Sequence, residues 1–366
     1  MRGATLRGDD VVEHFIATTN HHWLLFFTTA GRVYRTKAYN LPEALRDAKG
    51  GHVAGLLSFQ PDEAIAQVLA IRDYEQAPYL VLATRNGLVK KTRLADYNSP
   101  RQAGVIAINF RDDDDELIGA ELVNGEDDIL LLSRKGQAIR FRADDDQLRP
   151  MGRATSGVTG MKFRDGDSVL SMSVIRATQV AAEEAAGLSE HDAEAADVEA
   201  SEEQIRDVKP QYVFTMTDAG FAKRTRINEY RMQGRGGLGI KAMQFNEERG
   251  KGSLVGGFIV EDGDEILSIT QGGQVVRSPI DDNFPPKGRS TQGVKFVSPK
   301  GGDAVAVVAR SVESKVDEDE GGGTAPADGD ETTESPENGP DATIDGQEPA
   351  DTGATEAAED AGESEG

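Results

Sequence analysis

The chain has 366 residues and no cysteine, and its 64 Asp and Glu residues outnumber its 40 Lys and Arg residues. This length can bury one or two sizeable cores, and the lack of cysteine excludes a disulfide scaffold, a thiolate metal site and a cysteine nucleophile. No apolar run approaches the roughly 20 residues that span a bilayer, and the first ten residues lack the apolar core of a signal peptide. We therefore expect a soluble, cytoplasmic protein.

The negative charge is concentrated in two segments. Residues 311–366 contain 19 acidic and 1 basic residue, and residues 181–207 contain 10 acidic and 1 basic residue. The rest of the chain has 35 acidic and 38 basic residues and is therefore faintly basic. Such a region can bind a polyanion although the chain as a whole is acidic.

Five repeats follow one another along the chain. Each begins with an apolar run, a polar turn with glycine and a short strand with basic residues, at 24–37, 80–93, 129–142, 212–226 and 265–278. The turn glycines are Gly31, Gly87, Gly136, Gly220 and Gly273, at intervals of 56, 49, 84 and 53 residues. Without the 27 acidic residues 181–207, the longest interval becomes 57, so the period is a little over 50 residues.

Each repeat continues with two further strand signals. The first has an arginine shortly before a glycine, at 46–59, 101–110, 153–163, 235–245 and 289–297. The second is an apolar strand, at 64–71, 117–123, 169–175, 254–260 and 304–309. About four short strands per repeat is the size of a propeller blade, and radial packing protects the strand edges. We predict an all-β, propeller-like β-pinwheel of about five to six four-stranded blades over residues 1–310.

Two segments do not fit the repeat. An acidic insert at about 177–208 interrupts the chain between the third and fourth repeats, and its few apolar residues predict a mobile loop or a transient helix. Residues 311–366 consist mainly of Gly, Pro, Thr, Ala, Asp and Glu. Such a composition buries too little apolar surface to offset the entropy of ordering, which predicts a disordered acidic tail.

Basic residues recur at equivalent positions of the repeats, one of them four residues after each turn glycine. A propeller would place these positions around one rim, as a curved basic stripe that contacts DNA phosphates without reading bases. The candidate DNA-binding residues are Arg35, Lys37, Arg46, Lys90, Lys91, Arg93, Arg101, Arg140, Arg142, Arg153, Lys223, Arg224, Arg226, Arg235, Arg277 and Arg289. No catalytic residue, metal site or cofactor is predicted.

One glycine-rich segment allows close approach of a phosphate to the backbone. It reads Gln233, Gly234, Arg235, Gly236, Gly237, Leu238, Gly239. Closely spaced glycines let backbone N–H groups reach a phosphate, with an arginine beside them. The segment lacks the Lys-Ser/Thr ending of a phosphate-binding P-loop, so nucleotide hydrolysis is not indicated. A flexible turn is the equally simple alternative.

The repeats, together with RPMGRATSGVTGM at 149–161 and VLATRNGLVKKT at 81–92, resemble the C-terminal domain of the DNA gyrase A subunit over residues 9–309. The resemblance implies a β-pinwheel that binds and wraps double-stranded DNA for ATP-dependent negative supercoiling. It also implies two partners, the breakage–reunion region that precedes this domain in gyrase A, and the gyrase B subunit.

The family carries a Q-R-R-G-G-K-G box after its first blade, and we expect that blade and box to be missing here. Residues 233–239 are box-like, with Gly234 and Leu238 in place of two cations. Two alternatives remain, a propeller that serves as a protein-interaction scaffold and the equivalent domain of a topoisomerase IV subunit.

Overall fold

The computed structural model describes residues 16–45, 48, 50–164, 166–185, 209–245, 252–299 and 302–311. The chain divides into two compact units, residues 1–313 and 314–366, and all described residues belong to the first. The predicted tail after Ser311, most of the acidic insert (186–208) and Arg46 lie outside the described residues.

The strands form five sheets, one for each repeat. The first contains β1 (Trp23–Thr28), β2 (Arg32–Lys37), β3 (Ile65–Ile71) and β6 (Val105–Ile106), and the second β4 (Tyr79–Thr84), β5 (Leu88–Arg93), β7 (Leu117–Val123) and β10 (Val158–Thr159). The third contains β8 (Asp128–Ser133), β9 (Gln137–Arg142), β11 (Val169–Ile175) and β14 (Ile240–Lys241). The fourth contains β12 (Gln211–Thr217), β13 (Phe221–Arg226), β15 (Leu254–Glu261) and β18 (Val294–Lys295), and the fifth β16 (Glu265–Thr270), β17 (Val275–Pro279) and β19 (Val305–Ser311).

Helices are few and short among the described residues. Four 3-10 turns, η1 (Ala38–Asn40), η2 (Val53–Gly55), η3 (Leu94–Tyr97) and η4 (Ile227–Glu229), join the strands, and α1 (Ala177–Ala185) opens the acidic insert. The insert therefore begins with an ordered helix, in which Gln179 is buried and Val180 packs on the core between the third and fourth sheets. No helix in the described part of the chain is long and apolar enough to cross a membrane.

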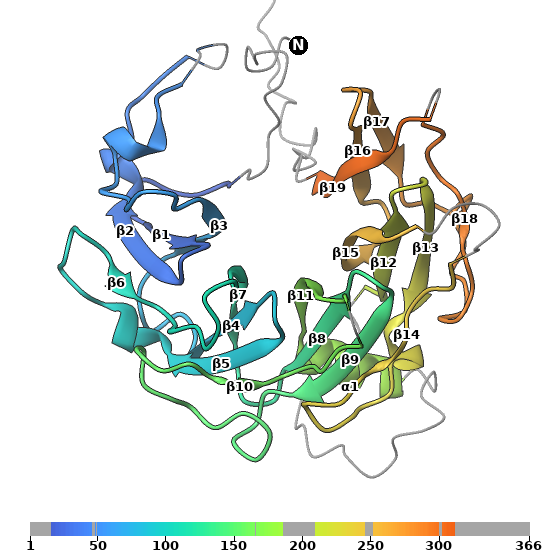
Figure 1. The fold of residues 1–366 in the computed structure, drawn as a ribbon, viewed down its shortest axis with the longest axis horizontal. Coiled ribbons are helices and arrows are strands. Elements are labelled where there is room, and N and C mark those ends of the chain that lie inside the picture. The colour runs from blue at the N-terminus through green and yellow to red at the C-terminus, as the bar shows by residue number, and fades with distance from the viewer. Residues whose placement is uncertain are drawn as a thin grey trace, which may run out of the picture. The chain divides into compact units, whose positions relative to one another are not determined.

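Repeats two to five each contribute their outermost strand to the sheet of the preceding repeat, an arrangement here called strand exchange. In each four-stranded sheet the inner strand, the turn hairpin and the outer strand are hydrogen-bonded in that order, but the outer strand comes from the next repeat. Thus β6 follows β5 in the chain and pairs with β2, and β10 follows β9 and pairs with β5. The fifth sheet has three strands among the described residues, where the prediction was four. In Figure 1 the outer strands lie at the perimeter of the first unit, and the inner strands β7, β11, β15 and β19 lie toward its middle.

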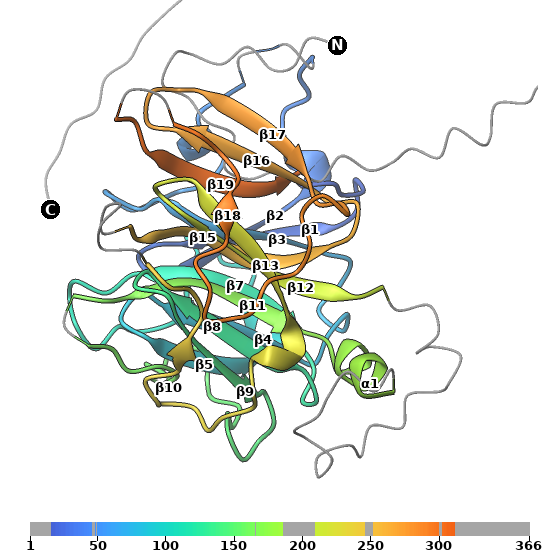
Figure 2. The ribbon, with the colours of Figure 1, turned by 90° about the vertical axis from the view of Figure 1, so that its right-hand side faces the viewer.

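The hydrophobic cores lie between successive sheets. The first hairpin strand of each of the first three sheets has a continuous apolar run because its two faces are both covered, as in Leu80–Ala83 of β4. Leu80 and Leu82 pack against the first sheet, whereas Val81 and Ala83 pack against the third. Inner strands of successive sheets also contact each other, β3 with β7, β7 with β11, β11 with β15 and β15 with β19. Figure 2 shows the sheets stacked edge-on.

The turn glycines match the predicted register. Gly31 has φ +72°, and a Cβ at this position would lie 2.7 Å from the carbonyl oxygen of Ile108. Gly31 therefore serves both as the left-handed turn residue and as the close contact with the segment that follows β6. The predicted all-β pinwheel with one sheet per repeat is confirmed.

Candidate nucleic-acid interface

The five cations four residues after the turn glycines, here called the latch row, are Arg35, Lys91, Arg140, Arg224 and Arg277. Arg140 is 5 % exposed, and its Nε and Nη2 donate to Asp128 Oδ2 at 2.9 and 2.7 Å. Its Nη1 donates to the carbonyl oxygens of Ile227 and Tyr230 at 3.4 and 3.3 Å. Because both carbonyls belong to the next repeat, Arg140 joins the third and fourth repeats.

Three other members of the latch row reach the same part of the following repeat. Arg35 donates to Asn98 Oδ1 at 2.5 Å, and Arg224 donates to the carbonyl oxygen of Phe284 at 2.6 Å. Lys91 donates to the carbonyl oxygen of Ala143 at 2.5 Å and forms an ion pair with Asp145 at 2.8 Å. These acceptors all follow the second hairpin strand of the next repeat.

Burial corrects the prediction for this row. Lys91 is 0 % and Arg224 3 % exposed, so that they and Arg140 cannot reach a phosphate without leaving their partners. Arg35 is half-buried beneath Trp23, 4.4 Å from its ring centroid. Arg277 is exposed and paired with Glu265 in its own sheet. Four of the five cations therefore contact the following repeat, and for the buried Lys91, Arg140 and Arg224 this contact replaces the predicted contact with DNA.

Lys90 and Lys223, one position earlier, are also fully buried. Lys90 Nζ donates to the carbonyl oxygens of Ala107, Arg153 and Thr155. Lys223 Nζ donates to those of Gly288, Arg289 and Thr291. Neither ammonium is available to DNA, which corrects their prediction as phosphate contacts.

The arginines before the outer strands connect neighbouring outer strands. Arg153 donates from Nη1 to the carbonyl oxygen of Ile106 in β6, and Arg289 donates from Nη1 to that of Lys241 in β14. Arg235 donates from Nη1 to the carbonyl oxygen of Thr159 in β10 at 3.2 Å. These three arginines are half-buried, whereas Arg101 is exposed. None of these contacts tests binding to DNA, which stays a prediction for all four arginines.

The cations six residues after the turn glycines divide into two pairs. Arg93 and Arg226 are exposed, and no side-chain hydrogen bond or ion pair holds either of them within the part of the chain that the structure describes. Lys37 is half-buried, donates to the carbonyl oxygen of His21 and lies 4.0 Å from the ring centroid of Trp23. Arg142 is half-buried beside Asp128, at 3.4 Å. Arg93 and Arg226 are the better-placed candidates.

A further set of exposed cations lies on the outer strands or just after them and was not predicted. These outer-strand cations are Arg111, Lys162, Arg164, Lys241 and Lys295. Lys241 and Lys295 occupy equivalent positions, two residues after Gly239 and Gly293, and Arg111 and Arg164 are both seven residues after their glycines. The repeat was also visible in the sequence at these positions, but only the strand order shows that Lys241 and Lys295 lie on outermost strands and that the other three cations follow such strands.

The box-like segment lies across the outer edge of the second and third sheets. Gln233 N donates to the carbonyl oxygen of Arg140 at 2.8 Å, and Gly236 N donates to that of Gly160 at 2.6 Å. Lys162 N donates to the carbonyl oxygen of Gly237 at 2.8 Å, and Leu238 is 46 % exposed. The segment is therefore held by its backbone beside the outer-strand cation Lys162.

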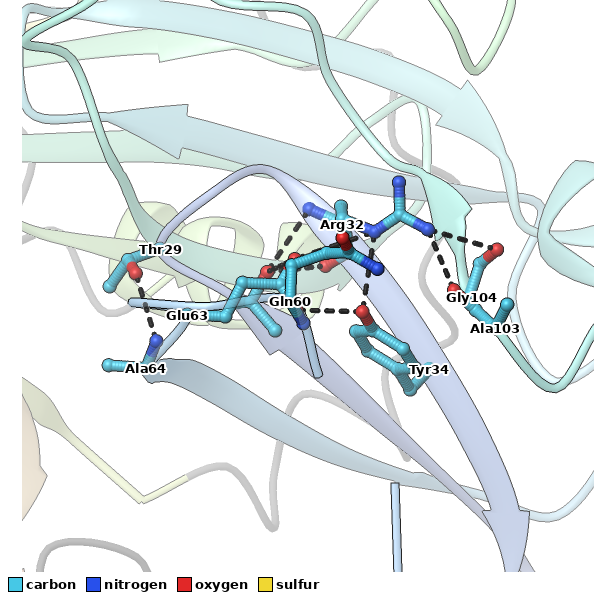
Figure 3. A network of polar contacts seen from close by, with 9 residues as sticks. Thr29, Arg32, Tyr34, Gln60, Glu63, Ala64, Ala103 and Gly104 are labelled. Carbon is cyan, nitrogen blue, oxygen red and sulfur yellow. Dashed lines mark hydrogen bonds and ion pairs between the residues drawn. The ribbon is translucent and has the colours of Figure 1, made fainter. Parts of the chain in front are cut away.

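In the first sheet a hydrogen-bonded network without net charge, formed by Tyr34, Glu63 and Arg32, takes the place of the buried lysine. Tyr34, equivalent to Lys90, donates its hydroxyl to Glu63 Oε2 at 2.7 Å (Figure 3). Arg32 lies beside both, 3.4 Å from Glu63 Oε1, and donates to the carbonyl oxygen of Ala103 at 2.7 Å. Burial together with the Glu63 hydrogen bond raises the pKa of Tyr34. The arginine and the carboxylate compensate each other, so this network adds little charge to the perimeter.

Comparison with known proteins places the chain in one family. The family described as the DNA gyrase C-terminal domain, a β-propeller, matches residues 22–72, 78–124, 127–176, 211–261 and 264–310. The DNA gyrase A subunit of a Nocardioides species is 73% identical over the whole chain, which spans 40% of that protein. The DNA gyrase A subunit of Streptomyces coelicolor is 55% identical over 86% of the chain, which corresponds to 33% of its own length.

Solved structures show the same fold at low identity. The C-terminal domain of a DNA topoisomerase IV matches 80% of the chain and 79% of its own length, with a TM-score of 0.65 and 22% identity. A DNA gyrase A C-terminal domain matches 80% of the chain and 83% of its own length, with a TM-score of 0.59 and 22% identity. The family match covers all five repeats, each of which forms one sheet. The chain belongs to the DNA gyrase C-terminal domain family of β-propellers.

Proposed function

We propose that this chain binds double-stranded DNA along the perimeter formed by its outer strands and so supplies the DNA-wrapping part of a gyrase A subunit. The observation that carries the proposal is the set of outer-strand cations, which recur on successive sheets and are exposed on one edge. Phosphates spaced along a duplex match such a row, and no recognition helix is present among the described residues to read bases.

The whole protein is proposed to act in ATP-dependent negative supercoiling in the cytoplasm. Its partners would be the breakage–reunion region of gyrase A and the gyrase B subunit, because we predict no catalytic group on the basic edge and catalysis would have to come from those parts. The assignment is favoured over a topoisomerase IV subunit because two relatives that are 73% and 55% identical to the chain are A subunits of gyrase, whereas the topoisomerase IV domain of similar fold is 22% identical.

The test replaces three outer-strand cations, Lys162, Arg164 and Lys241, together with alanine. We expect the affinity for every duplex to fall by about tenfold at low salt, and the plot of log K against log salt to become shallower by roughly 2–3 units. The control is the single variant Arg72→Ala, which removes one exposed cation that follows the inner strand β3, away from the outer strands, and is compared with one third of the effect of the triple variant. Anisotropy titrations with duplexes of several sequences measure both quantities. Unchanged affinity and slope would favour a protein-interaction scaffold instead.

A further inference from the structure

Two loops at the perimeter share a sequence pattern and an internal lysine. They are Gly152–Gly157, which precedes β10, and Gly288–Gly293, which precedes β18, and both read Gly-Arg-x-Thr-x-Gly. Each threonine donates its hydroxyl to the carbonyl oxygen of the first glycine at 2.8 Å. The two loops close the second and fourth sheets, so the pattern returns on alternate sheets.

The lysine lies beneath its loop in both cases. Lys90 Nζ has the carbonyl oxygens of Arg153 and Thr155 on one side and that of Ala107 on the other. Lys223 Nζ donates to Gly288 and Thr291 at 3.0 Å each and to Arg289. An ammonium group has three N–H donors, and three carbonyls therefore satisfy it completely. Among the described residues no carboxylate accepts a hydrogen bond from either ammonium group, so each lysine binds the backbone of its loop. The second loop is also held by Glu229, whose Oε2 accepts from the backbone N of Arg289 at 2.6 Å.

The loop in turn holds its arginine against the neighbouring outer strand. Nη1 of Arg153 donates to the carbonyl oxygen of Ile106, and Nη1 of Arg289 donates to that of Lys241. Inside the described region Nε and Nη2 of both guanidinium groups have no hydrogen bond. Those two nitrogens form the edge that meets a phosphate oxygen pair. Sheets one and three have Tyr34 and Ile139 at the lysine position, and their loops lack the Gly-Arg-x-Thr-x-Gly pattern.

We propose that Lys90 and Lys223 are positioning residues, each of which fixes one of two equivalent loops so that Arg153 and Arg289 meet a phosphate of the DNA backbone. The inference rests on the proposed DNA binding and deepens it, because it assigns two matched contacts on alternate sheets. The lysines act through the arginines and do not touch DNA.

A double-mutant cycle tests the coupling. We expect Lys90→Met to weaken duplex binding roughly fivefold at low salt, as Arg153→Met does, and Lys90→Met with Arg153→Met to weaken it no further. Lys223→Met and Arg289→Met should behave in the same way. Arg72→Met controls for the loss of one positive charge. Losses that multiply in the double variant, or no loss in Lys90→Met, would overturn the proposal.

Amide hydrogen exchange separates this proposal from the question of DNA binding. Lys90→Met should speed exchange in residues 152–157 and leave 288–293 unchanged, and Lys223→Met should do the reverse. If the unmodified chain does not bind DNA, the proposed function fails whatever the exchange shows. If it binds DNA but neither loop responds to its lysine, only the positioning role fails.

The pH profile of DNA binding by the unmodified chain gives a second readout. Burial lowers the pKa of Lys90 to about 7, helped by the nearby Arg153. Burial lowers the pKa of Lys223 to about 7 as well, with Glu229 opposing and Arg289 assisting the shift. A neutral amine has only two N–H donors for three carbonyls, so the loops should loosen as the pH rises through this range.

DNA affinity and stability should therefore move in opposite directions. From pH 6 to pH 9 we expect affinity to fall severalfold in the unmodified chain and to stay flat in a Lys90→Met, Lys223→Met variant. The free energy of unfolding should rise over the same range, because both lysines lose protons in the folded state well below their ordinary pKa of 10.5. If the two lysines only stabilised the fold, DNA affinity would rise together with the free energy of unfolding over this pH range. That result would contradict the proposal.

Discussion

At the scale of single residues, burial decides what a cation does in this fold. Arg140 and Arg277 occupy equivalent positions, four residues after their turn glycines. Arg140 is enclosed with Asp128, which is 0 % exposed, whereas Arg277 pairs with Glu265 at the surface. Two charges removed from water must satisfy each other, while an exposed pair is screened by solvent. The same residue type therefore serves in one case as an internal contact and in the other as a surface ion pair.

Replacing Arg140 with methionine should lower the free energy of unfolding by about 3–5 kcal/mol, because Asp128 would keep only the more distant Arg142. Arg277→Met, the matched control, should cost less than about 1 kcal/mol. Urea denaturation followed by circular dichroism measures both. Equal costs would mean that the buried pair contributes no more than the exposed one.

At the scale of elements, strand exchange makes each sheet depend on the repeat that follows it. The outer strands are only two residues long and form few ladder hydrogen bonds. Their place in the sheet therefore also depends on the glycine that precedes each of them. Gly157 has φ +73°, and a Cβ there would lie 2.5 Å from the carbonyl oxygen of Val89 in β5. The close approach of β10 to β5 is possible only without a side chain at this position.

We expect Gly157→Val to lower the free energy of unfolding by about 2–4 kcal/mol, through both the left-handed backbone and the clash with β5. Gly51→Val is the control, since a Cβ at Gly51 meets nothing within 4 Å and its backbone is not left-handed. Its cost should be below about 0.5 kcal/mol. Thermal or urea denaturation of the two variants decides this, and similar costs would show that β10 tolerates displacement.

At the scale of the whole molecule, successive sheets share cores, latch contacts and outer strands. A central strand such as β4 contributes alternate side chains to two different cores, so neither neighbouring sheet can be removed without exposing apolar surface. This makes the repeats a continuous scaffold, along which the cations proposed to bind DNA are arranged. The sequence predicts no catalytic residue and no nucleotide loop for it, so we expect binding without catalysis.

The purified chain should neither relax nor supercoil plasmid DNA, even with ATP and magnesium. Agarose gels of plasmid topoisomers measure this, with a complete gyrase as the positive control. Any change in linking number produced by the chain alone would contradict the assignment of binding without catalysis.

The sequence by itself determined the period, the five repeats and the positions of most strands, whereas the number of blades was predicted only as five to six. Apolar runs, turn glycines and alternating residues are local signals, and five copies of one pattern reinforced them. The turn glycines Gly31 and Gly87 both have a left-handed backbone, as glycine in a tight turn permits. The helix α1 was not predicted with these bounds, because the few apolar residues near Val180 gave no clear stripe.

Only the tertiary structure decided which cations face solvent. Lys90 and Lys91 are adjacent in β5 and point to opposite faces of the sheet, yet both are buried, one beneath a loop of the next repeat and the other against its ion-pair partner. Charge along a strand indicates exposure only when one face of the sheet is open to water. Here the exchanged strands and neighbouring sheets cover both faces, so exposed cations such as Lys162 and Lys241 remain at the outermost strands.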